Sequence, residues 1–234
     1  MRIDILTLFP EMFAPLKESI IGRASEAGKI EIYITDIRNY TLDKHKKCDD
    51  YPFGGGAGML MMPQPIADAI DAIDPDHEAL RLYMSPKGKR FEQKMVATFL
   101  KYNRILLLCG HYEGIDQRVL DDYIDDEVSI GDYVLTGGEL PAMVISDAVC
   151  RYVDGVIAGE SLKDESFADN LLEYPQYTRP QDFRGKKVPD VLVSGNHALV
   201  DKWRKEQAIM LTRKKRPDLY RKYKRALEKE NNKK

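Results

Sequence analysis

The sequence contains few cysteines and no long hydrophobic run. Its three cysteines, Cys48, Cys109 and Cys150, form neither an even set for disulfides nor a CxxC pair for a metal site. No apolar stretch approaches the roughly 18 residues that a membrane helix needs. The chain opens directly on a strand-like apolar segment, residues 3–9, which is unlike a signal peptide. We therefore expect a cytoplasmic protein without a membrane segment.

Two common nucleotide-binding motifs are also missing. The glycine-rich segment FGGGAGML, residues 53–60, has Met59 where a dinucleotide-binding G-x-G-x-x-G motif requires its third glycine. No Gly-Lys pair is followed by Ser or Thr, as a phosphate-binding P-loop requires. These absences argue against the commonest nucleotide-binding folds.

Two other glycine-containing segments each follow or include a stretch typical of a strand. The first is ILLLCGHYEGID, residues 105–116, and the second is SIGDYVLTGGELPAM, residues 129–143. Glycine lets backbone amides and carbonyls approach a ligand directly, because no Cβ intervenes. Open α/β sheets bind their ligands where the strands end. The two segments therefore predict a small-molecule site, although ordinary turns between strands would show the same pattern.

Strand and helix patterns alternate along the first part of the chain. Apolar runs typical of strands and segments typical of helices follow one another at residues 3–9, 30–34, 67–73, 80–84, 91–100 and 105–109. This alternation predicts an α/β fold with a mostly parallel sheet and helices on both faces. One more helix is expected after Leu140, with Gly155 as its C-terminal stop.

Charge is distributed unevenly. The net charge is only −2, but residues 184–234 carry 17 basic and 6 acidic residues, a net charge of +11 that leaves −13 for the rest of the chain. Such asymmetry predicts a basic segment that binds a polyanion, most plausibly nucleic acid. Trp203, Tyr220 and Tyr223 lie among the basic residues and could stack on bases. A solvated helical surface is the alternative interpretation.

Six sequence strings carry a family resemblance. They are LFPEMF (8–13), YPFGGGAGMLMMPQP (51–65), CGHYEGID (109–116), SIGDYVLTGGELPAM (129–143), LLEYPQYTRP (171–180) and VPDVLVSGNHA (188–198). In this order, and over nearly the whole chain, they resemble the bacterial tRNA (guanine-N1)-methyltransferases of the SPOUT superfamily.

The resemblance implies a fold and a division into domains. Residues 1–158 would form a SPOUT-type parallel-sheet domain for cofactor binding and dimerisation, in which the glycine loops cross to form a trefoil knot. Residues 159–174 would be a flexible linker, and residues 175–234 a small, basic, mostly helical domain that binds tRNA. Periodicity alone predicts only an ordinary doubly wound sheet, because true knots are rare.

The resemblance also implies an activity. A methyl group would pass from S-adenosylmethionine to N1 of the guanosine on the 3′ side of the tRNA anticodon, position 37. The family is homodimeric, with its active site at the subunit interface, and is expected to use Mg²⁺. A non-catalytic RNA-binding protein and an enzyme that methylates another RNA position are the two alternatives.

The family motifs, matched residue by residue, also imply the cofactor site. It would comprise Tyr83, Met84, Pro86, Gly110, Tyr112, Glu113, Ile130, Gly131, Asp132, Tyr133, Val134, Leu135, Gly137, Gly138 and Pro141.

The implied reaction requires a base and a cation. Guanine N1 carries a proton that a base must remove, and the negative charge that develops toward O6 is stabilised by a fixed cation. Arg151 matches the family's arginine and is the predicted cation. The family's base is an aspartate directly before Ser-Phe, a position that Glu165 occupies in this sequence. Glu165, the preceding Asp164 and, more weakly, Asp169 are therefore the candidate bases, and a solvated acidic linker is the alternative.

Overall fold

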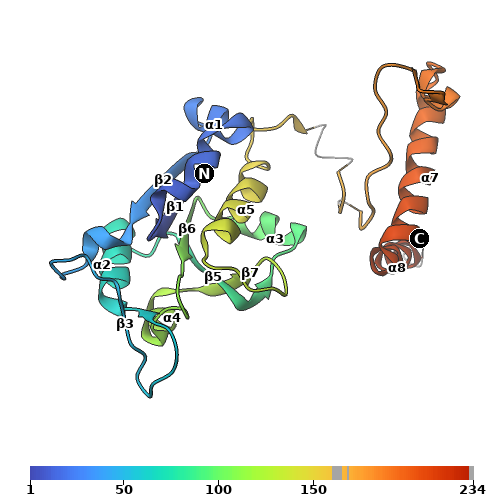
Figure 1. Ribbon diagram of the computed structural model, residues 1–234. Helices are drawn as coiled ribbons and strands as arrows, with labels where there is room; N and C mark the ends of the chain where they lie inside the picture. Colours follow the sequence, from blue (N-terminus) through green and yellow to red (C-terminus); the bar gives the residue numbers. More distant parts are fainter. Residues whose placement is uncertain (160–164, 168, 232–234) are drawn as a thin grey trace. The chain divides into compact units, whose positions relative to one another are not determined.

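The computed structural model describes residues 1–159, 165–167 and 169–231 (Figure 1). The chain divides into two compact units, Met1–Ala158 and Gly159–Lys234. Within the described residues, no helix is long and apolar enough to cross a membrane.

A five-stranded parallel sheet forms the centre of the first unit. Its strand order is β2-β1-β6-β5-β7, and all four neighbouring pairs are parallel. The strands are β1 (Arg2–Thr7), β2 (Glu31–Asp36), β5 (Leu80–Arg90), β6 (Arg104–Cys109) and β7 (Asp126–Ser129). The prediction of a mixed α/β fold with a parallel central sheet is confirmed.

Both faces of this sheet are buried, which explains the continuous apolar runs in the sequence. Side chains alternate between the two faces of a strand, so Ile105 and Leu107 of β6 enter one core while Leu106 and Leu108 enter the other. Helices α1 (Ser19–Glu26), α3 (Gln93–Phe99) and α5 (Glu139–Cys150) cover the first core, and α2 (Pro63–Ile73) and α4 (Gln117–Tyr123) cover the second (Figure 1).

Shorter elements complete the first unit. They are the 3₁₀ helices η1 (Pro10–Lys17) and η2 (Ile37–Tyr40) and the antiparallel pair β3 (Asp49–Asp50) and β4 (Leu60–Met61). A loop of nine residues joins β3 to β4.

Strand β5 and helix α5 differ from the sequence-based expectation. β5 continues past Met84 to Arg90, and its pairing with β7 shifts register between Met84 and Lys89. Such an irregularity frees part of the strand from the ladder and redirects its side chains. α5 ends at Cys150, not at Gly155, because the backbone amides of Tyr152 and Val153 bond carbonyls three residues back and tighten the turn.

Two helices dominate the second unit. They are α7 (His197–Lys215) and α8 (Pro217–Asn231), preceded by the two-residue strands β8 (Asp182–Phe183) and β9 (Lys186–Lys187) and the 3₁₀ helix η3 (Asp190–Val193). The Asn196 side chain accepts a hydrogen bond from the Leu199 amide at 3.2 Å, which caps the N-terminus of α7.

Candidate cofactor site

Two loops lie side by side at the carboxyl ends of β6 and β7. The first follows Cys109, the last residue of β6, and the second joins β7 to α5. The Gly138 amide donates a hydrogen bond to the Gly110 carbonyl at 2.9 Å, and His111 pairs with Gly137 in an antiparallel bridge. The two glycine segments that the sequence singled out are thus joined through their backbones.

Gly138 allows this close approach. A Cβ at residue 138 would lie 2.8 Å from the Cα of Cys109 and 3.0 Å from the amide nitrogen of Gly110. Both neighbours are backbone atoms, which cannot move away as a flexible side chain can. Glycine is therefore required here by packing.

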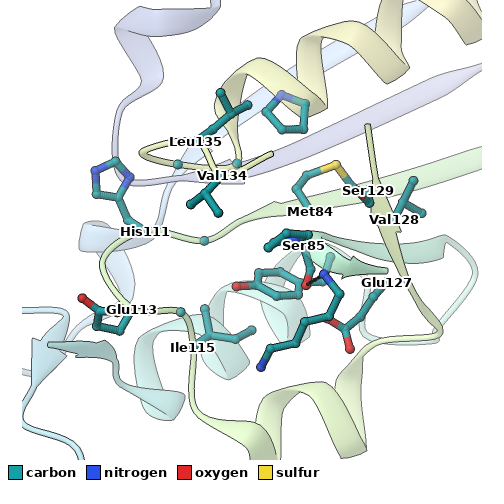
Figure 2. Close-up of a pocket in the computed structure, with 18 of the residues that line it drawn as sticks. Met84, Ser85, His111, Glu113, Ile115, Glu127, Val128, Ser129, Val134 and Leu135 are labelled. Carbon is teal, nitrogen blue, oxygen red and sulfur yellow. Dashed lines mark hydrogen bonds between the residues drawn. The ribbon is translucent and has the colours of Figure 1, made fainter. Parts of the chain in front are cut away.

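The end of β5 forms the third side of a cavity of about 310 Å³ (Figure 2). His111 and Glu113 line one side of it, and Glu127 and Ser129 the opposite side. Fourteen of the fifteen predicted cofactor residues line this cavity: Tyr83, Met84, Pro86, Gly110, Tyr112, Glu113, Ile130, Gly131, Tyr133, Val134, Leu135, Gly137, Gly138 and Pro141. The structure therefore brings together residues from three separate sequence segments.

Asp132 is the predicted cofactor residue that does not line the cavity. Its side chain is 90% exposed, and its carboxylate lies 4.0 Å from the Arg90 guanidinium.

Several lining residues were not predicted from the sequence. Ser85, Lys87, Glu127 and Ser129 line the cavity because they lie where β5 and β7 end. The signal for Ser85 and Lys87 was their place directly after the predicted strand at 80–84. Ser129 begins the second glycine segment, residues 129–143, which was its signal. Glu127 gave a weaker signal, because β7 is a four-residue strand with acidic residues at its start.

The cavity is weakly polar and contains no cluster of cationic side chains. Its charged lining residues are Lys87, Glu113 and Glu127, together with the titratable His111. The Glu127 Oε2 atom is buried and has no hydrogen-bond partner among the described residues. Burial, and then the charge of Glu127, raises the pKa of Tyr83 to about 12, so its hydroxyl stays neutral at physiological pH. Such a cavity suits a cofactor without phosphate groups better than a dinucleotide.

The first loop carries backbone strain that marks it as specialised. Tyr112 has a φ of 58°, a left-handed conformation that non-glycine residues rarely adopt. Burial, followed by the nearby carboxylate of Asp49, raises the pKa of the Tyr112 hydroxyl. Strained residues of this kind cluster at ligand sites.

Glu139 connects both loops to strand β1. Its carboxylate is 1% exposed, accepts a 2.9 Å hydrogen bond from the Thr7 hydroxyl, and lies 3.8 Å from Nδ1 of His111. The His111 ring also contacts the Phe9 ring, with 4.7 Å between centroids. Because Glu139 begins α5, the helix dipole favours its negative charge. These contacts hold the first loop in place against the second.

Of the predicted catalytic residues, Arg151 belongs to the first unit but does not line this cavity. Arg151 directly follows α5 and lines a separate hollow with Ile20 and Val144 in the first unit. Glu165 and Asp169 belong to the second unit, where they line a smaller hollow and where Asp169 lies 3.6 Å from Lys205. Asp164 lies outside the described residues.

The described part of the chain contains no group of three His, Cys, Asp or Glu side chains that converge as a metal site would require. We therefore derive no chemical step through Mg²⁺.

A parallel sheet with helices on both faces and a cavity formed by strand-end loops places the first unit in the α/β class, with a candidate ligand site at its strand ends. Comparison with known proteins then gives the family. A family model described as tRNA (guanine-1)-methyltransferase TrmD matches residues 1–222, and the chain belongs to this family.

Curated relatives are similar in sequence to this chain over almost their whole length. A tRNA (guanine-N(1)-)-methyltransferase of Ruminiclostridium cellulolyticum is 56% identical over 226 residues, which cover 95% of this chain and 97% of the relative. A protein of the same name from Clostridioides difficile is 54% identical, and the match covers 95% of this chain and 98% of the relative. Another from Clostridium botulinum strain Langeland is also 54% identical, and the match covers 96% of this chain and 93% of the relative.

Proposed function

We propose that the protein transfers a methyl group from S-adenosylmethionine to N1 of guanosine 37 in tRNA. Family membership supports tRNA guanine-N1 methylation. The structural observation that supports the proposal is the cavity formed by the two paired glycine loops, because its lining of glycine backbone and apolar side chains suits a cofactor without phosphate groups.

The residues of the cavity fit S-adenosylmethionine. This cofactor carries positive charge and no phosphate, and the lining offers the carboxylates of Glu113 and Glu127. Apolar side chains such as Val134 and Leu135 would cover the faces of the adenine. The backbone groups of residues 130–135 would form hydrogen bonds with its edge. When bound, the cofactor supplies an electrophilic methyl group.

The protein must also remove the N1 proton and stabilise charge at O6. We assign the first task to Glu165, which stands directly before Ser166 and Phe167 as the family's aspartate does. Asp164 is the alternative base. Asp169 is weaker, because it already lies 3.6 Å from the Lys205 ammonium. Arg151 would stabilise the negative charge that develops on O6.

The protein would act as a homodimer whose subunits share each active site. Exposed apolar side chains on η1, α1 and α5 support this proposal: Met12, Ile20, Leu140 and Val144 are 39–48% exposed. Ile20 and Val144 line the same hollow, and exposed apolar surface that is contiguous is typical of interaction sites. The molar mass in solution, from light scattering, tests this assignment.

Four further features complete the proposal. The paired glycine loops would cross as a trefoil knot, and residues 175–234 would bind tRNA through the basic surfaces of α7 and α8. The enzyme would work in the cytoplasm, where its tRNA substrate is found, and would use Mg²⁺. Methyl transfer with and without a chelator tests the requirement for Mg²⁺.

The substrate assignment is tested with paired transcripts. Labelled S-adenosylmethionine is incubated with the protein and with tRNA transcripts that carry either guanosine or adenosine at position 37. We expect label only in the first transcript, recovered as N1-methylguanosine after digestion to nucleosides. Label in both transcripts, or in another nucleoside, would assign the enzyme to a different RNA position.

A further inference from the structure

The loop between β3 and β4 presents two aromatic side chains to solvent. Phe53 is 100% exposed and Tyr51 is 78% exposed. Among the described residues, no other large hydrophobic side chain is as exposed as Phe53. Aromatic side chains normally contribute to cores or interfaces through large buried areas. The position of Phe53 therefore indicates a partner that covers it.

Glycines hold this loop in an unusual backbone conformation. Gly54, Gly55 and Gly56 have φ values of 85°, 77° and 127°. A Cβ on Gly54 or Gly55 would meet no atom within 4 Å, so neither glycine is required for space. They are required for the left-handed backbone, which favours glycine. The loop between β3 and β4 extends away from the sheet (Figure 1). Phe53 directly precedes its three glycines in the sequence.

The C-terminal end of the loop is attached to the rim of the cofactor cavity. The Glu113 amide donates to the Met59 carbonyl at 3.0 Å, and the Met61 amide donates to the Gly114 carbonyl at 3.0 Å. Gly58 also packs directly on Glu113, since a Cβ there would lie 2.5 Å from its Cγ. Because Glu113 lines the cavity, the C-terminal end of this loop lies at the cavity rim.

The chemistry of the substrate explains what an exposed aromatic at this rim would contact. Guanine N1 lies on the base-pairing edge, so the base must leave its stack to reach a methyl donor inside the cavity. Its neighbour then loses a stacking partner. Proteins that bind unpaired RNA replace such partners with exposed aromatic rings.

We propose that Phe53, supported by Tyr51, stacks on an unpaired RNA base adjacent to the guanosine that is methylated. This inference rests on the proposed function and adds a substrate contact in the first unit, separate from the basic second unit. Tyr51 is two residues away on the same loop, so it can contact the same segment of RNA.

Substitutions at residue 53 separate aromatic stacking from hydrophobic contact. Phe53→Ala and Phe53→Leu remove the ring, Phe53→Trp enlarges it, and Leu42→Ala is the control because Leu42 is 85% exposed outside the loop. Base–aromatic stacking contributes about 1–3 kcal/mol, so tRNA affinity should fall about 5- to 150-fold in Phe53→Ala and Phe53→Leu. It should stay near the wild-type value in Phe53→Trp and Leu42→Ala.

Cofactor affinity and thermal unfolding serve as controls for structure. Both should match the wild-type protein in every variant, since Phe53 touches neither the core nor the cavity. Wild-type tRNA affinity in Phe53→Leu would overturn the proposal and would suit a surface for a protein partner. Equal losses of tRNA and cofactor affinity would also overturn it, because they would indicate a structural role.

Fluorescence gives a direct readout of stacking. The chain has one tryptophan, Trp203, so the emission that Phe53→Trp adds to that of the wild-type protein comes from residue 53. We expect tRNA to quench this added emission, and its persistence in the complex would overturn the proposal. RNA binding is measured separately from methyl transfer, so a wild-type protein inactive on every tRNA would count against the proposed function alone.

Discussion

At the scale of single residues, a few side chains and glycines determine the cavity. Gly138 lets the second loop approach Cys109, and the buried carboxylate of Glu139 accepts a hydrogen bond from the Thr7 hydroxyl of β1. The glycine positions could be predicted from sequence because the effect of a missing Cβ is local and depends only on the residue type. Glu127 was missed because its role depends on the pairing of β7 with β5, which a four-residue strand does not reveal.

Gly138→Ala tests the close packing of the two loops. The added Cβ would collide with backbone atoms at 2.8 and 3.0 Å. We expect a loss of about 1–3 kcal/mol in the free energy of unfolding, together with weaker binding of S-adenosylmethionine in calorimetry. Gly159→Ala is the matched control, since a Cβ there meets nothing within 4 Å. Wild-type stability and cofactor affinity in Gly138→Ala would refute the packing argument.

Tyr83 predicts a stability change at alkaline pH. Burial raises its pKa to about 12 in the folded protein, whereas an unfolded tyrosine has a pKa of about 10. The folded state therefore keeps its proton longer, and the stability present below pH 10 is lost as the pH rises from 10 through 12.

The Tyr83→Phe variant isolates this effect. Relative to the wild-type protein, it should gain stability on the order of 2 kcal/mol between pH 9 and pH 12, measured by denaturant unfolding at each pH. A difference between the two proteins that stays constant over this range would mean that Tyr83 titrates normally.

At the scale of elements, burial on both faces made the central strands predictable. β6 is apolar from Ile105 to Cys109, and five of the six residues of β1 are buried, so both strands lie inside the sheet. The irregular continuation of β5 to Arg90 was not predictable, because it depends on pairing with β7 after a register shift. The end of α5 was misplaced because local turn bonds, and not Gly155, terminate the helix.

Helix α7 anchors the segment that follows Glu165 and Asp169. Thr212 is fully buried, and its hydroxyl accepts a 2.8 Å hydrogen bond from the Leu172 amide while it donates to the Ala208 carbonyl. Leu171 is also buried, with 6% exposure. The segment that follows Glu165 is thus hydrogen-bonded to α7 through Leu172.

Thr212→Val tests this anchor. Valine keeps the shape of threonine but cannot accept the hydrogen bond, and an unsatisfied buried amide costs about 1–3 kcal/mol. We expect faster amide hydrogen exchange at Leu172 and a lower free energy of unfolding of the second unit. Thr178→Val, at an exposed position, should change neither quantity. Unchanged exchange at Leu172 in Thr212→Val would show that the anchor contributes nothing.

At the scale of the whole molecule, charge is divided between an acidic body and a basic C-terminal segment. Residues 184–234 carry a net charge of +11 against −13 for the rest. Polyanion binding releases counterions, so its affinity falls steeply with salt, whereas a small cofactor in a cavity is little affected.

Salt dependence therefore distinguishes the two ligands. Between 50 and 200 mM salt, tRNA affinity should fall by at least about tenfold, while S-adenosylmethionine affinity should change by less than about twofold. Filter binding and calorimetry measure the two affinities. Parallel responses of both ligands would show that the basic segment does not carry tRNA binding.

The most direct measurement is single-turnover methyl transfer to a tRNA transcript with guanosine at position 37. The wild-type protein is compared with Glu165→Ala and Asp164→Ala, with S-adenosylmethionine at saturation. We expect rapid transfer by the wild-type protein and by Asp164→Ala, and a loss of about 100-fold or more in Glu165→Ala, which lacks the base. A wild-type protein that binds S-adenosylmethionine but methylates no tRNA would contradict the proposed reaction, and full activity in both variants would contradict a linker carboxylate as its base.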